Sequence, residues 1–386
     1  MAASNHCTKT DLPVRKVISQ QAPHQASVRY VLLSQAPFFI RQIAYIGLIF
    51  LHLSQSAAAQ ALIHTESPYK PAHILFTPAT FSNSFSLNVK PVLYINSGDT
   101  VQTETIDAFG RDKNGVKRQG GGNPLTGPFY INNSRAGDAL KITLTKLSLN
   151  RNYAYTTESF ALRSMPGSIT KQFKKPHIVK WKLDVENGFA SPDSSYTSYN
   201  NLRDFKVPVH HFLGCIGVAP GNKKNEILSF FQGDFGGNLD FSRICQSSII
   251  YLPVLHDGGF LYIGDGHAVQ GDGEIAGNAL ETSLDAEFTV ELIKNGAAQI
   301  KSPRIEDSVY IMSTGSGKTL DIAIKIATSN LLDWLQQDYY LTLPEATQVM
   351  STTIEYTIAE IADPEVIVAA KIKKKILKQL KSKQRW

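Results

Sequence analysis

Three consecutive runs decide the fold: SIIYLPV (248–254), FLYI (260–263) and GDGHAVQGDGE (264–274). The first two are rich in β-branched and aromatic residues and are separated by a turn at Asp257-Gly258-Gly259, which predicts two strands. The third run sets three carboxylates, one imidazole and one carboxamide between four glycines. Glycine reaches backbone conformations that other residues avoid. We therefore expect a glycine-hinged hairpin tip that turns its polar side chains toward a common point.

The acidic residues of the third run favour a site with chemistry. Crowded carboxylates repel one another unless a cation or shared protons relieve them. Two structural alternatives remain from the residues alone, an ordinary turn and a calcium loop that only stabilises the fold. A helix–loop–helix calcium site does not fit, because the spacing differs and the flanks read as strands.

The run 264–274 resembles the signature of the acetamidase/formamidase family, GDxHAxQGDGE. Other segments resemble the family's motifs and follow the same order: SGDTV (97–101), ETIDA (104–108), PLTGPFY (124–130), AGDAL (136–140), GCIGVAP (214–220), GGNLD (236–240), LDIA (320–323), LPEA (343–346) and MS (350–351). The likeness covers residues 64–368. One departure is NNSRA (132–136), where the family commonly has Gly-Ala-Glu-Pro, so the size of the substrate stays open.

The resemblance implies a fold and a reaction. The fold is α+β and predominantly β, with antiparallel sheets in a sandwich- or barrel-like body and C-terminal helices; the catalytic domain is placed at residues 62–370. The reaction is hydrolysis of a small linear amide, such as acetamide or formamide, to a carboxylate and ammonia. The resemblance also implies a homo-oligomer.

A divalent metal suits this reaction, because it acidifies bound water and polarises a carbonyl. Asp265 and His267 are the expected metal ligands, and the resemblance points to Asp107 as a third from the amino-terminal sheet. An imidazole fits zinc best, whereas the hard carboxylate oxygens would also suit calcium, magnesium or manganese. The alternatives are a buried neutral histidine at His267 and a turn-capping aspartate at Asp107.

Glu274 is the candidate general base, with Asp272 and Gln270 in the catalytic set. Gln270 and Asn238 are expected to hold the substrate's carboxamide, since a side-chain amide offers both a donor and an acceptor. Asp240 and Asp272 could each support the metal ligands or bind a second metal ion. The structural alternative for Asp240 is that it caps backbone amides in a turn.

A cysteine route competes with the metal route. Cys215 lies between Gly214 and Gly217 and is either a nucleophile or a buried apolar cysteine. Cys215 and Cys245 could also form a disulfide, which the sequence does not decide. The run GSGKT (315–319) lacks the first glycine of a phosphate-binding loop, so we interpret it as a turn that begins a helix at Leu320.

Helices are expected late in the chain, at 320–337 and 344–362, after an excursion at 171–207 that reads as a hairpin or lid. Residues 1–61 read as a secretory presequence, with Arg41 before an apolar stretch at 43–53 and an Ala-x-Ala exit. We therefore predict export to the periplasm or medium, with no membrane span after cleavage, since the stretch is too short to cross a bilayer.

The basic charge lies at the ends of the chain. Without residues 1–61, 34 basic residues face 32 acidic ones; without the basic tail at 371–386 as well, 26 face 32. A basic isoelectric point that arises this way does not indicate nucleic-acid binding. The class that competes with the amidase is an exported, non-catalytic binding protein on the same scaffold.

Overall fold

The computed structural model describes residues 69–380, apart from 174, 176 and 196–198. From Lys70 onward these residues belong to one compact unit. The predicted presequence at 1–61 and the last residues of the basic tail lie outside the described residues.

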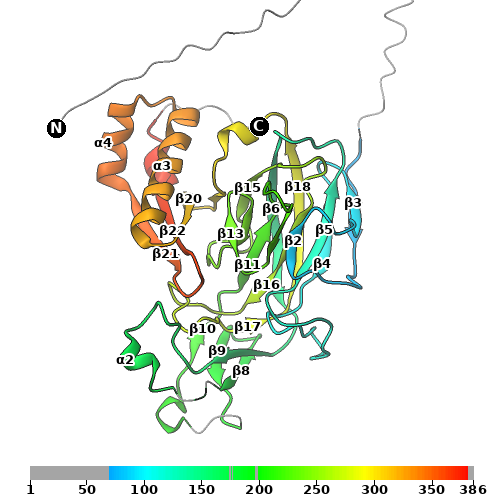
Figure 1. Ribbon diagram of the computed structural model, residues 1–386, viewed down its shortest axis with the longest axis vertical. Coiled ribbons are helices and arrows are strands. Elements are labelled where there is room, and N and C mark those ends of the chain that lie inside the picture. Colours follow the sequence, from blue (N-terminus) through cyan, green and yellow to red (C-terminus); the bar gives the residue numbers. More distant parts are fainter. Residues whose placement is uncertain (1–68, 174, 176, 196–198, 381–386) are drawn as a thin grey trace, which may run out of the picture. The chain divides into compact units, whose positions relative to one another are not determined.

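Two large sheets make up most of this unit (Figure 1). The nine-stranded sheet runs in the order β1 (His73–Leu75), β4 (Thr100–Glu104), β18 (Leu284–Ile293), β6 (Ala139–Leu149), β15 (Ile249–Pro253), β19 (Arg304–Glu306), β20 (Tyr310–Gly317), β22 (Val366–Lys373) and β21 (Glu355–Glu360).

The eleven-stranded sheet carries the start of the run 264–274. Its order is β10 (Val207–Pro208), β9 (Phe189–Pro192), β8 (Ile178–Asp184), β7 (Tyr153–Thr157), β17 (Glu281–Thr282), β16 (Leu261–His267), β11 (Phe212–Gly217), β14 (Gly236–Asn238) and β13 (Gln232–Gly233), with β5 (Leu125–Ile131) pairing β16 and β3 (Leu93–Ile95). A small separate pair joins β12 (Glu226–Leu228) to β2 (Ser84–Ser86).

The main hydrophobic core lies between the two large sheets. Along β18 the even-numbered residues from Leu284 to Val290 are buried while the intervening ones are less so, as expected for a strand with one face on a core. Phe288 of β18 meets Phe129 of β5 from the other sheet, with ring centroids 5.2 Å apart. The predicted β-rich, sandwich-like fold class is confirmed; the sheets do not close into a barrel.

Helices cover one end of the nine-stranded sheet, where α3 and α4 lie beside β20–β22 (Figure 1). Among the described residues, the helical segments are α2 (Gly167–Thr170), α3 (Leu320–Tyr339), α4 (Leu343–Thr353), α5 (Lys374–Leu377) and the 3-10 turns η1 (Asn200–Leu202) and η2 (Ala297–Gln299). Thr319 caps α3, its side chain accepting from the Ile322 amide. The predicted start of a helix at Leu320 is correct, but the predicted turn at 315–319 is wrong for 315–317, which end β20.

The predicted helix at 344–362 is wrong beyond Thr353, because α4 ends there and β21 follows. Thr352, Thr353 and Ile354 are β-branched, which lowers their helix propensity and favours extended backbone. Their backbone leads into β21, which pairs with β22. This difference matters for the site described below.

Other expectations need smaller corrections. β15 and β16 do not form a hairpin, since each belongs to a different sheet. β3 pairs with β5 in parallel, which differs from the antiparallel arrangement expected there. The excursion at 171–207 contains the β8–β9 hairpin. The first three residues assigned to the basic tail, 371–373, end β22.

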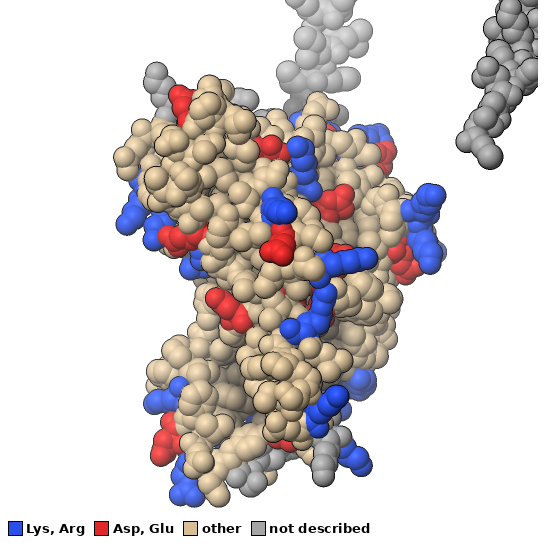
Figure 2. Space-filling view, turned by 60° about the vertical axis from the view of Figure 1, so that its left-hand side comes forward, with Lys and Arg blue, Asp and Glu red and all other residues tan. Residues whose placement is uncertain are grey.

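The surface view shows Lys and Arg interspersed with Asp and Glu over the face drawn, rather than one extended field of a single sign (Figure 2). Among the described residues, no helix combines the length and apolarity that crossing a bilayer requires.

Candidate active site

Strand β16 delivers two of the predicted site residues, Asp265 and His267. It pairs with β11, β5 and β17 and is buried along its whole length. The expected hairpin tip therefore begins only after His267. Glycine serves here for close packing, because a Cβ at Gly266 would lie 2.8 Å from the Thr282 carbonyl oxygen.

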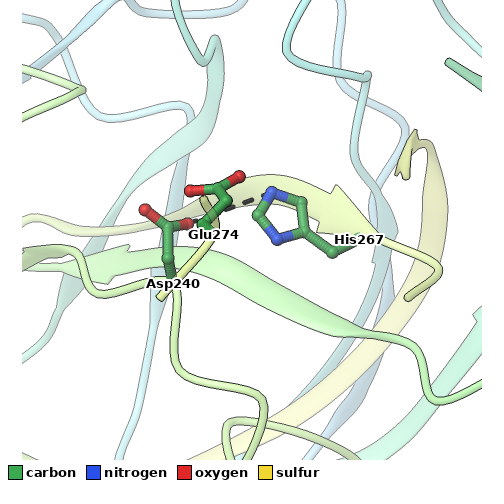
Figure 3. Close-up of side chains that lie close together, drawn as sticks. All are labelled: Asp240, His267 and Glu274. Carbon is green, nitrogen blue, oxygen red and sulfur yellow. Dashed lines mark ion pairs between the residues drawn. The ribbon is translucent and has the colours of Figure 1, made fainter. Parts of the chain in front are cut away.

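Four side chains converge on the imidazole of His267. Its Nε2 lies 3.3 Å from Glu281 Oε2, 3.4 Å from Asp265 Oδ2 and 3.9 Å from Asp240 Oδ1. These side chains are at most 2% exposed. Glu274, also buried, brings its carboxylate to the same imidazole beside Asp240 (Figure 3).

Gln270 fixes the imidazole. Its amide nitrogen donates to the backbone oxygens of Asp240 at 2.7 Å and Ala359 at 3.1 Å, so its Oε1 faces His267 Nδ1 at 2.8 Å as an acceptor. Nδ1 therefore carries the proton that the Gln270 oxygen accepts, and Nε2 faces the carboxylates.

The cluster holds more buried acid than the protein compensates. Asp240 Oδ1, Asp265 Oδ1, His267 Nε2 and Glu281 Oε2 are buried without a well-formed hydrogen bond, although His267 Nε2 and Glu281 Oε2 lie within ion-pair distance of each other. Buried polar atoms are nearly always paired, so each exception needs an explanation. Two overlapping groups, Asp240–His267–Glu274 and Asp265–His267–Glu281, place one potential ligand atom per residue within 4.8 Å of one another and could hold a metal ion. The unpaired oxygens and the imidazole nitrogen fit a divalent cation.

Burial and mutual repulsion shift the pKa values of these groups. Burial, followed by the nearby Asp265 carboxylate, raises the pKa of Asp240 well above its usual range. Burial raises the pKa of Glu281 to about 7, although the His267 imidazolium opposes the shift. For His267, burial lowers the pKa, but the Glu281 and Asp265 carboxylates outweigh it and the net pKa is well above normal. Without a bound cation the cluster therefore retains protons near neutral pH.

Three acidic residues of the site also have strained backbones. Asp240, Asp265 and Glu274 have positive φ values of 41°, 56° and 45°. A left-handed non-glycine residue is uncommon and costs on the order of 1–3 kcal/mol. Such strain concentrates at functional sites, where the surrounding structure holds it in place.

The floor of the site comes from β11 and β14. A Cβ at Gly214 would lie 2.6 Å from both Asp240 Oδ1 and Asp265 Oδ2, so a glycine is required for the carboxylates to approach. Cys215 Sγ lies 2.8 Å from Asn238 Oδ1. Burial, followed by Asp265, raises the pKa of this thiol well above its usual value. Cys215 and Cys245 are both free, so the disulfide alternative does not hold.

A cavity of about 360 Å³ opens beside the cluster. Gln270 and Glu274 line it, together with residues of β7, β8 and the segment 269–280. Glu274 therefore belongs both to the buried cluster and to the cavity wall.

Asn238, one of the two predicted substrate-binding residues, lies beside the cluster. Its amide nitrogen donates to the carboxylates of Asp240 and Asp363, and its oxygen accepts from Asn123 and Cys215. The carboxamides of Asn238 and Gln270 are thus engaged within the protein, and their predicted contact with substrate stays a prediction.

Two predicted residues lie outside the cluster. Asp107 is fully buried but forms an ion pair with Arg151 at 2.8 Å and accepts from the Arg111 amide. Asp272 is exposed, although it is only two residues from Glu274. Neither contributes to the two groups that could hold a metal ion.

Sequence reasoning missed Glu281, Glu360 and Asp363. Glu281 reaches the site because it pairs with His267 across β16 and β17. Glu360 ends β21 and bridges to Gly273, and burial raises the pKa of Asp363 to about 7. For Glu360 and Asp363, the β-branched run before β21 was a sequence signal that could have predicted the strand. No comparable signal in the sequence pointed to Glu281.

The fold and site define a β-sandwich protein with a buried acid–imidazole centre capable of holding a metal ion. The model of the Acetamidase/Formamidase family matches residues 75–228 and 232–379, and the chain belongs to that family. It is 31% identical over 150 residues to a formamidase of Methylophilus methylotrophus, a match covering 34% of this chain and 37% of that protein. The matches span about a third of the length of the curated relatives.

Solved structures extend the likeness over most of the chain. An acetamidase from Yersinia enterocolitica has a TM-score of 0.67 at 28% identity and covers 81% of this chain and 95% of that one. An acetamidase from Bacillus halodurans has a TM-score of 0.67 at 25% identity, covering 80% and 99%.

Proposed function

We propose that this protein is a metal-dependent amidase that hydrolyses small linear amides to a carboxylate and ammonia. The observation that carries the proposal is the convergence of two buried oxygens without a hydrogen bond, Asp240 Oδ1 and Glu281 Oε2, on His267 Nε2 beside a cavity. Membership of the acetamidase/formamidase family supports the reaction class.

Asp265, His267 and Glu281 would hold the ion, with Asp240 facing the same nitrogen of His267. Zinc is our first assignment, because an imidazole with mixed carboxylates suits it, and calcium, magnesium or manganese are the alternatives. A divalent ion held there would acidify water and polarise a carbonyl. Asp107 takes a supporting role instead, because its charge is already paired with Arg151.

Glu274 is the general base in this proposal. A base must reach water and substrate, and Glu274 is the cluster carboxylate that also lines the cavity. Burial, followed by the Asp240 carboxylate, raises the pKa of Glu274 well above normal, which favours its accepting a proton near neutral pH. It would take a proton from water and deliver it to the departing nitrogen. Gln270 keeps Nε2 of His267 facing the carboxylates.

Ammonia release tests the proposal directly. The purified full chain is assayed with formamide, acetamide and propionamide, before and after treatment with a chelator, and its metal content is measured. We expect turnover that chelation abolishes and zinc restores. Turnover by metal-free protein that chelators leave unchanged would exclude the metal role, whereas no release from any amide would exclude the amidase.

Export through residues 1–61 and assembly into a homo-oligomer are further parts of the proposal. The sequence pattern of the presequence supports the first, and the resemblance to the family supports the second. The amino-terminal residue of the mature protein and its native mass test them. An amino terminus upstream of residue 59 contradicts the proposed cleavage, and a native mass equal to one chain contradicts the oligomer.

A further inference from the structure

The cavity beside Glu274 is mostly apolar. Besides Gln270 and Glu274, its lining includes Trp181, Val207, Val269 and Leu280, together with Phe205. Trp181 and Phe205 meet edge to face, with centroids 6.2 Å apart and an interplanar angle of 77°. Both come from the excursion at 171–207, a segment that carries no chemical signature in its sequence.

The cavity is larger than the simplest amides require. Its volume of about 360 Å³ holds roughly twelve water-sized groups at about 30 Å³ each. An amide group and one methyl carbon take about four of these places. The remaining space is bounded by aliphatic and aromatic side chains, which favour an apolar occupant.

The exposed side chains that line the cavity also favour an apolar ligand. Phe205 is 44% exposed and Ile275 is 41% exposed, and both line the cavity. Apolar side chains gathered at a concave opening are typical of binding sites, whereas isolated exposed ones are ordinary. The cavity therefore combines a few polar side chains, those of Gln270, Glu274, Thr156, Thr157 and Asn278, with a predominantly apolar lining.

We infer that the preferred substrates are primary amides with an apolar acyl group of about six to nine carbons, held between Trp181, Phe205 and Val207. This inference rests on the proposed amidase function and names its substrate class. The amide lies at the Glu274 end, and the acyl group extends along the apolar walls. The nitrogen leaves as ammonia and carries no further bulk, so the apolar part of the substrate is the acyl side.

A chain-length series tests the inference on the metal-loaded full chain. The kcat/KM values are compared for acetamide, butyramide, hexanamide and phenylacetamide, with N-hexylacetamide carrying its alkyl group on nitrogen. Burying one methylene is worth about a fourfold gain, and hexanamide has four more methylenes than acetamide, so even partial burial should raise its kcat/KM at least about tenfold above that of acetamide. Values that stay flat or fall with chain length, or N-hexylacetamide exceeding hexanamide, would overturn the inference.

Variants assign the effect to the cavity wall. Phe205→Ala should lower the ratio of kcat/KM for hexanamide over acetamide about fivefold. Phe173→Ala is the matched control, because Phe173 belongs to the same excursion, is 36% exposed and packs against Phe160 rather than lining the cavity. The control should leave the ratio unchanged; equal effects of the two variants would contradict the assignment.

Binding separates this inference from the proposed function. Calorimetric titration with hexanamide and acetamide measures occupation of the cavity without turnover. Acetamide hydrolysis without a gain in hexanamide binding or turnover refutes the substrate class and leaves the amidase intact. No hydrolysis, but hexanamide binding that Phe205→Ala weakens, refutes the amidase while supporting the apolar cavity.

Discussion

Two buried charged centres meet at β17 and are built in opposite ways. In the first, Asp107 pairs with Arg151, whose remaining donors reach the Glu281 carbonyl and the Thr282 hydroxyl. In the second, the carboxylates of Asp240, Asp265, Glu274 and Glu281 surround the single imidazole of His267, so the acidic groups outnumber the one basic group. Glu281 belongs to both, with its backbone in the first centre and its carboxylate in the second.

This contrast distinguishes a structural ion pair, Asp107–Arg151, from the candidate active site around His267. A buried charge is tolerated when a partner and hydrogen bonds compensate it, as at Arg151. The His267 cluster lacks that balance within the protein, so a cation or extra protons must supply it. Breaking the first centre should therefore affect stability, and changes in the second should affect ligand and turnover.

The largest effect is expected for Glu274→Gln. Loss of a general base typically lowers turnover by about 10²–10⁴-fold. Metal content should be retained, because Asp265, His267 and Glu281 remain. Asp272→Asn is the matched comparison two residues away, on an exposed side chain. Steady-state ammonia release and metal analysis measure both; equal losses in the two variants would remove the distinction between Glu274 and Asp272.

Asp107→Asn tests the balanced centre. Removing one partner of a buried ion pair typically costs about 3–5 kcal/mol, because Arg151 would be left buried and uncompensated. Urea unfolding measures this loss, and metal content per folded chain should stay unchanged. Asp257→Asn is the control, since it breaks the solvent-exposed pair with Arg135 and should change the free energy of unfolding far less than Asp107→Asn does. Loss of metal without loss of stability would restore Asp107 as a ligand.

Much of the second centre could be predicted from sequence because its residues crowd into one segment. Asp265, His267, Gln270 and Glu274 all lie within the run 264–274, and the motif order matched that of a known family. The fold class was implied by the resemblance to that family, and the alternating burial along β18 agrees with it. The sequence pattern was enough to predict site residues that lie close together in the chain.

The rest of the site depends on strand pairing between residues that are far apart in the sequence. Glu281 meets His267 only because β17 pairs with β16 in that register, which nothing within 264–274 specifies. Reading 344–362 as one helix concealed Glu360, whose position depends on β21 pairing with β22. The family resemblance suggested Asp107 as a ligand, and the sequence did not indicate that Asp107 forms an ion pair with Arg151.

Metal removal should make stability depend on pH in a defined direction. In metal-free protein the pKa values of Glu281 and Asp363 are about 7, above the ordinary values of 4.5 and 3.8. Between these limits the folded state keeps protons that the unfolded state has lost, so stability falls as pH rises from about 4 to 7. The raised pKa of His267 also makes stability fall as pH rises, but it does so above the ordinary histidine pKa of 6.5.

The expected change is a few kcal/mol, at about 1.4 kcal/mol per unit of pKa difference. Urea unfolding of chelated protein at several pH values measures it. Glu281→Gln should flatten the slope, and zinc should oppose it by replacing protons. A metal-free protein whose stability rises from about pH 5 to 7 would show that the cluster's charges are compensated after all.

The smallest effect is expected at Cys215, the thiol of the unbalanced centre. Alkylation requires a thiolate, and burial followed by Asp265 raises the pKa of this thiol. In a Cys7→Ser/Cys245→Ser protein, Cys215 is the one remaining cysteine. Native iodoacetamide treatment should therefore leave its mass and activity unchanged, while unfolded protein should be labelled. Rapid labelling of the native protein with loss of turnover would instead indicate that Cys215 is the nucleophile and that the surrounding carboxylates assist it. The contrast between the two centres would then no longer identify a metal site.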